Sequence, residues 1–188
     1  MDARNIGLRN IEVADSKICS IDGEHGKLIY RGYDILDLVN RSTFEETTFL
    51  LLFGDLPNDS QLEDFSNTLK NSRDIPNSII IDLHNRPKTA HPMDVLQSCV
   101  SYLSNYDNDI SSDTKEDNVR RAMLLIAKMP SIVAAWDRIR NGLEYVKPDS
   151  ELSHSANFLY MLSGRKPELE ETKVFDICLI LHAEHSFN

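Results

Sequence analysis

The spacing of hydrophobic positions predicts helices along most of the chain. In the stretch STFEETTFLLLFG, residues 42–54, Ser42 and Thr43 each stand three residues before a glutamate, and Gly54 follows the apolar run. A hydroxyl residue in that position is typical of a helix start, and glycine of a helix end. Helical spacing of apolar residues recurs from about residue 59, after Pro76, over 92–103, over 114–141, up to Gly164 and from about 170 onward. The predicted fold class is all-α.

One segment near the start of the chain is typical of strands instead. The runs KICSI and KLIYR, within residues 17–31, flank a turn that has glycine at both ends. We predict a short β-hairpin there. A lone hairpin is marginally stable in water, so it is expected to pack against the helices.

Two features qualify the helix over 114–141. Pro130 lies inside it, and we predict one helix bent at this residue rather than two. The polar stretch that precedes the helix, NYDNDISSDTKEDN, is predicted to be a solvated loop. The neighbouring Arg120 and Arg121 are predicted to lie on a solvated helix face.

Composition narrows the class of protein. At 188 residues the chain is long enough for one domain. A net charge of −10 argues against a large nucleic-acid surface. The longest apolar run, FLLLF, is too short to span a membrane, and the first residues lack the apolar core of a signal peptide, so a cytoplasmic location is expected. The three cysteines, Cys19, Cys99 and Cys178, are predicted to be buried core residues.

Two of the six histidines form the main candidate site. His182 and His185 are three residues apart near the end of the last predicted helix, where they would share one face. Three interpretations compete: a metal site, a pair of satisfied buried histidines, or a binding face for an anionic carbonyl compound. Two histidines supply too few ligands for a metal, and we predict none. Spacing alone does not separate the other two interpretations. The remaining histidines, His154 among them, are predicted to be structural or solvent-exposed.

Six stretches taken together resemble the citrate synthase family. They occur in the family's order and span nearly the whole chain: SIDGEHGKLIYRGYDILDL, STFEETTFLLLFGDLP, AHPMDVL, AKMPSIVAAWDRIRNG, ANFLYMLSG and DICLILHAEHSFN. The resemblance implies that residues 1–188 are the N-terminal part of the family's large helical domain. It also implies that the small coenzyme A-binding domain, the catalytic histidine and the catalytic aspartate lie beyond residue 188.

The same resemblance assigns a role to one histidine. The family's motif contains a histidine that binds oxaloacetate, and His185 matches it, whereas no substrate contact is assigned to His182. Two neighbours depart from the motif, because Glu184 stands for an aspartate and Ser186 for a glutamate. Because these neighbours differ in charge and reach from the motif's residues, we expect the departures to alter how the His185 imidazole is oriented.

The implied activity is condensation of oxaloacetate with acetyl-CoA to citrate and coenzyme A. The thioester is a substrate, and no cofactor is implied. A close alternative is a 2-methylcitrate synthase that uses propionyl-CoA. A third possibility is a non-catalytic helical module. The family implies a homodimer formed through helices near 91–105 and 115–141, where the small Ala134 and Ala135 suit close helix approach. The 188-residue chain alone is expected to be inactive as a synthase.

Overall fold

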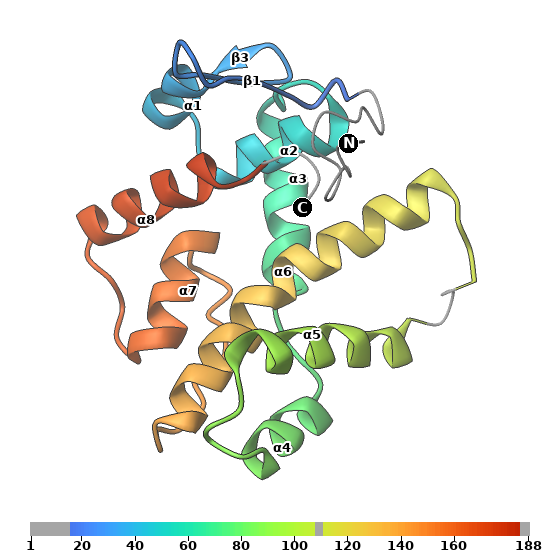
Figure 1. The fold of residues 1–188 in the computed structure, drawn as a ribbon, viewed down its shortest axis with the longest axis vertical. Helices are drawn as coiled ribbons and strands as arrows, with labels where there is room; N and C mark the ends of the chain where they lie inside the picture. The colour runs from blue at the N-terminus through green and yellow to red at the C-terminus, as the bar shows by residue number, and fades with distance from the viewer. Residues whose placement is uncertain (1–15, 108–110, 185–188) are drawn as a thin grey trace, which may run out of the picture.

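The computed structural model describes residues 16–107 and 111–184. These residues form a mostly helical fold with a small sheet near the N-terminal end (Figure 1). The strands are β1 (Cys19–Asp22), β2 (Lys27–Tyr30) and β3 (Tyr33–Asp34). The helices are α1 (Ile35–Arg41), α2 (Phe44–Phe53), α3 (Asp59–Asn71), α4 (Asn77–Asn85), α5 (Pro92–Leu103), the 3₁₀ turn η1 (Ser104–Tyr106), α6 (Lys115–Arg140), α7 (His154–Ser163) and α8 (Leu169–Leu181).

The sheet has one strand more than the predicted hairpin. All three strands are antiparallel in the order β1-β2-β3, and Tyr30 is paired with Cys19 on one side and Tyr33 on the other. Arg31 and Gly32 both have positive φ, 49° and 94°, as a tight two-residue turn requires. The third strand is only two residues long and leads directly into α1, which is why no alternation in the sequence indicated it.

Helix ends follow the local signals in the sequence. Thr43 caps α2, where its side chain accepts from the Glu46 N–H and the Glu46 carboxylate accepts from the Thr43 N–H. Asn58 and Gln61 form the same reciprocal arrangement at α3. Gly54 ends α2 in the left-handed conformation that glycine adopts without strain. These boundaries are confirmed.

The described helices surround three apolar clusters. Below the sheet, α8 lies between α1 and α2 on one side and α7 on the other (Figure 1). The long helix α6 crosses the molecule and contacts α3, α4, α5 and α7. One core forms where α4, α5 and α6 meet, another joins the sheet to α1, α2 and α8, and a third joins α3 to α6.

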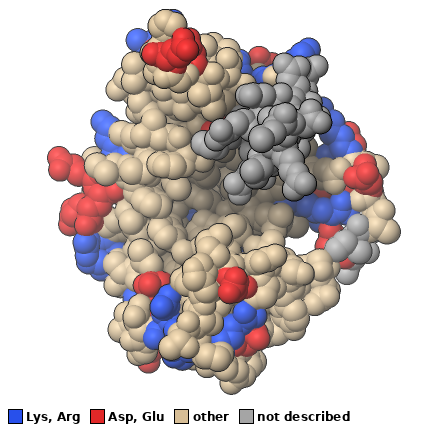
Figure 2. Space-filling model, viewed as in Figure 1, with Lys and Arg blue, Asp and Glu red and all other residues tan. Residues whose placement is uncertain are grey.

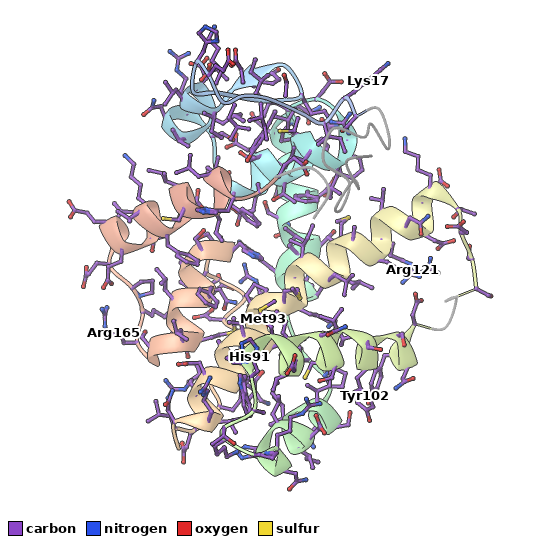
Figure 3. All side chains as sticks on the ribbon, in the orientation of Figure 1. Lys17, His91, Met93, Tyr102, Arg121 and Arg165 are labelled. Carbon is purple, nitrogen blue, oxygen red and sulfur yellow. The ribbon has the colours of Figure 1, made fainter. Side chains whose placement is uncertain are left out.

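The helix α6 is continuous through Pro130, as predicted, but the arginine pair near its start is not simply solvated. Arg120 and Arg121 both bind the Asp107 carboxylate, at 2.8 Å and 2.6 Å, so they fasten the end of the α5 region to α6. Figure 3 shows Arg121 on α6 beside the connecting segment. Ala134 and Ala135 are buried within the chain itself. The prediction that this pair contacts a second subunit is therefore wrong.

The described residues show how charge is distributed over one face and whether any helix could cross a membrane. On the face drawn in Figure 2, most of the surface is uncharged, and Lys and Arg side chains lie in small groups close to Asp and Glu side chains. Among the described helices, none is both long and apolar enough to cross a membrane.

Candidate functional site

The histidine segment begins where α8 ends. Its last turn tightens, because the N–H groups of His182 and Ala183 donate to the carbonyls of Leu179 and Ile180, three residues back, both at 3.2 Å. The helix therefore ends at Leu181. The prediction that it runs on through the histidine pair is wrong. The argument that His182 and His185 share one helix face loses its basis.

His182 is exposed at this helix end. Its Nδ1 lies 2.7 Å from the Cys178 carbonyl oxygen, so Nδ1 carries the proton and donates it. The bond satisfies one of the carbonyls that a helix end leaves without a partner. His185 and Ser186 lie outside the described residues, and Glu184 is the last residue described before them.

A tyrosine from the sheet reaches the segment that leads to His185. The hydroxyl oxygen of Tyr30 lies 3.1 Å from the Glu184 carbonyl oxygen, 3.3 Å from the Glu184 nitrogen and 3.4 Å from the Leu181 carbonyl oxygen. The hydroxyl accepts from the Glu184 N–H and donates toward the two carbonyls. Tyr30 is completely buried in one core with Ile180, and burial raises the pKa of its hydroxyl.

One carboxylate joins α8 to two other helices. Asp176 accepts a 3.0 Å bond from the Phe44 N–H, which belongs to the first turn of α2. It also accepts a 2.5 Å bond from the Ser155 hydroxyl on α7. The first four N–H groups of a helix have no partner within it, and a carboxylate there is stabilised by the helix dipole. Asp176 thereby fixes α8 at a position six residues before His182.

Three buried polar residues, Glu45, Arg73 and His154, form a cluster between α2, α7 and the end of α3. The Glu45 carboxylate accepts a 2.8 Å bond from the His154 N–H, and burial raises the pKa of this carboxyl. The His154 ring stacks on Phe44 at a centroid distance of 4.5 Å. Burial, assisted by the charge of Arg73, lowers the pKa of His154 to about 3, so its imidazole is neutral.

Arg73 completes this group. Its guanidinium is buried and donates to the carbonyls of Asp149 and Leu152 at 2.9 Å and 2.8 Å. Burial lowers the pKa of Arg73, while the nearby Glu45 opposes that change. The arrangement joins three helices and the loop before α7, and it makes His154 a structural histidine, as predicted.

The structure places the three cysteines differently from one another. Cys99 is buried as predicted, and burial raises its pKa. Cys19 is half-buried, and Cys178 is exposed, so the prediction for Cys178 is wrong. Cys178 lines a largely apolar groove of about 570 Å³ between α7 and α8, beside Leu159 and Phe175. Within the part of the chain that the structure describes, no three His, Cys, Asp or Glu side chains are gathered as metal ligands.

The contacts that hold the histidine segment were not predicted from sequence. Tyr30 occupies an inward position of a strand, and Asp176 occupies a helix position between apolar residues. Their partners lie 154 and 132 residues away, respectively. No local spacing marks such pairs, although the quoted stretches that carry the family resemblance contain both residues.

Comparisons with known proteins agree with the geometry. A family model described as "Citrate synthase, C-terminal domain" matches residues 7–188. A citrate synthase from Acidithiobacillus ferridurans is 44% identical over 187 residues, which are 97% of this chain and 48% of that protein. A 2-methylcitrate synthase from Mycobacterium tuberculosis is 38% identical over 182 residues, 97% of this chain and 46% of that protein.

A solved structure shows the same fold. The crystal structure of citrate synthase from Pyrobaculum aerophilum superimposes with a TM-score of 0.89 at 38% identity, over 96% of this chain and 47% of that one. The chain thus spans about half the length of the relatives it matches. Because the family model covers nearly all of its residues, the chain belongs to the citrate synthase family.

Proposed function

We propose that this protein condenses oxaloacetate with acetyl-CoA, and that His185 binds oxaloacetate. The observation that carries this proposal is the match to the family over residues 7–188, a range that includes His185. The 44% identity to a citrate synthase over nearly the whole chain supports the same activity. The histidine follows directly on a segment whose backbone is held by a buried tyrosine.

In this reaction His185 would orient and polarise the ketone. An imidazole N–H that donates to a carbonyl or carboxylate oxygen draws electron density from the carbon under attack. A separate carboxylate must remove the methyl proton of the thioester, which is a weak carbon acid and needs a desolvated base. We propose that this base, and the group that stabilises the enol, lie in the part of the relatives that this chain does not span.

We further propose that residues 1–188 are the N-terminal part of the large domain and that the protein acts in the cytoplasm. The small coenzyme A-binding domain would then lie in the other half of the relatives' length. The helical architecture and the 47–48% share of the relatives' length support this division.

Propionyl-CoA is the second candidate donor, because relatives that match equally far along the chain are 2-methylcitrate synthases. The two donors differ by one methylene, which a hydrophobic pocket discriminates by about 10- to 200-fold. Comparing kcat/KM for the two thioesters distinguishes them. A higher value for propionyl-CoA would replace the first proposal by the second.

We propose a homodimer through α5 and α6. Met93 and Tyr102 on α5 and Val133 on α6 are exposed apolar side chains, and such patches are typical of interfaces. Figure 3 shows Met93 at the start of α5. Sedimentation equilibrium tests this proposal, and a monomer at micromolar concentration would contradict it. A dimer that ignores oxaloacetate would support the non-catalytic module instead.

The decisive experiment is release of free thiol from acetyl-CoA by the protein at its full natural length, with and without oxaloacetate. Activity should depend on oxaloacetate and be lost in His185→Ala. The matched control is His25→Ala, because His25 lies in the exposed turn between β1 and β2. A folded protein without thiol release from either thioester would refute the proposed function.

A further inference from the structure

We propose that Tyr30 is a positioning residue for His185: its buried hydroxyl holds the backbone of Glu184 and so sets the direction in which the chain leaves α8. The inference rests on the proposed function, in which His185 binds oxaloacetate. It assigns to the sheet a role in the substrate site.

The contact uses the full hydrogen-bonding capacity of the hydroxyl. A phenol has one hydrogen to donate and can accept from a second group. At Glu184 it meets both backbone groups of one residue, the carbonyl oxygen at 3.1 Å and the nitrogen at 3.3 Å. A side chain that binds both groups fixes the rotation of the peptide planes on either side of that residue.

Tyr30 is itself held in place from both sides. It is in the central strand of the sheet and is paired with Cys19 and with Tyr33. Its ring is completely buried in one core with Leu38, Leu50 and Ile180. Because protein interiors are close-packed, the hydroxyl cannot move without displacing these neighbours.

The segment needs such a support because it is not helical. The i→i−4 ladder of α8 ends at Leu181, and the last turn already tightens at His182 and Ala183. Beyond the helix end, the Tyr30 hydroxyl makes hydrogen bonds with the Glu184 backbone in place of the helical ones. Ala183 packs against the same core, so the side chain before Glu184 is held as well.

Glu184, the residue that Tyr30 holds, directly precedes His185 in the chain. Consecutive Cα atoms are 3.8 Å apart, so the position and peptide orientation of Glu184 determine where the His185 side chain starts. Groups that bind a reacting molecule must be held within about 0.5 Å of their productive position. Loss of the hydroxyl should therefore weaken oxaloacetate binding more than thioester binding.

The test compares Tyr30→Phe with wild type, and Tyr33→Phe serves as the control. Phenylalanine keeps the ring in the core, and Tyr33 is a partly exposed neighbour in the same sheet. In Tyr30→Phe the Glu184 amide should exchange its hydrogen about three- to tenfold faster, as expected for one net hydrogen bond. The KM for oxaloacetate should rise about tenfold, while the KM for the thioester and both values in Tyr33→Phe stay unchanged.

A measurement on wild type alone keeps the proposal testable if Tyr30→Phe does not fold. The Glu184 amide should be protected from exchange, and oxaloacetate should increase that protection, because ligand and support stabilise the same conformation. Unprotected exchange at Glu184, or protection that oxaloacetate leaves unchanged, would overturn the positioning role. So would faster exchange in Tyr30→Phe at an unchanged KM for oxaloacetate. A wild type that binds no oxaloacetate would instead refute the proposed function on which the inference rests.

Discussion

Acidification from about pH 7.5 to pH 5 should destabilise this protein through one buried histidine. His154 is packed against Phe44, and its pKa is lowered from 6.5 to about 3, mainly by burial. In the unfolded chain the imidazole binds a proton below pH 6.5, whereas in the folded chain it stays neutral until about pH 3. The unfolded state therefore binds more protons between these values, and stability falls as the pH falls.

The size of the effect follows from the two pKa values. At pH 7.5 both states are nearly neutral at His154, and the contribution is close to zero. At pH 5 the pH is about 1.5 units below the pKa of the imidazole in the unfolded chain, so the unfolded state is stabilised by protonation. The free energy of unfolding falls by about 2 kcal/mol as a result. Glu45, whose pKa is raised by burial, acts in the opposite direction, because the folded state keeps its proton to higher pH.

Urea denaturation at the two pH values measures this difference in wild type and in His154→Gln, which carries no titrating group at the position. Since Glu45 remains in both proteins, its contribution cancels in the comparison. The variant should lose about 2 kcal/mol less than wild type on acidification. His84→Gln, at an exposed position of α4, should behave like wild type. Equal pH dependence in wild type and His154→Gln would refute the assignment of a neutral buried imidazole.

Three further outcomes are expected. Thr43→Ala removes the cap of α2 and should lower the free energy of unfolding by about 1 kcal/mol in urea titration; an unchanged midpoint would contradict the capping role. Asp176→Asn weakens the bonds to the Phe44 N–H and Ser155 and should cost about 1–3 kcal/mol in the same titration, and an unchanged value would show that a neutral amide holds α8 equally well. Iodoacetamide should modify Cys178 faster than Cys99 in the folded chain, as followed by peptide mass spectrometry, because only the first is exposed; equal rates would contradict the packing of α8.

The elements that could be predicted from sequence are those with local causes. A cap is made within three or four residues, so Thr43 and Asn58 identify the starts of α2 and α3, and Gly54 identifies an end. The end of α8 was misplaced because apolar residues continue to Ala183, while the helix stops at Leu181. Periodicity indicates which face is buried, and it does not show where a helix ends when no capping residue marks the place.

In the candidate site, too, only the features with a local cause could be predicted from sequence. The histidine motif is contiguous, so His185 could be proposed from sequence as the oxaloacetate residue, and this remains a proposal. The contacts of Tyr30, Asp176 and His154 connect elements more than a hundred residues apart and arise only from packing. Nothing in the sequence around these three residues indicates which distant residues they contact.

The contact between Tyr30 and Glu184 also has a consequence for the order of folding. It joins residues 154 positions apart, and closing so long a loop costs roughly 4–5 kcal/mol of chain entropy plus a constant. The core beneath the sheet includes Ile180, so it stays incomplete until α8 has been synthesised. The sheet is synthesised before α8 and is thus among the last of the described elements to consolidate, whereas contacts between near neighbours, such as those of α6 with α5 and α7, can form earlier.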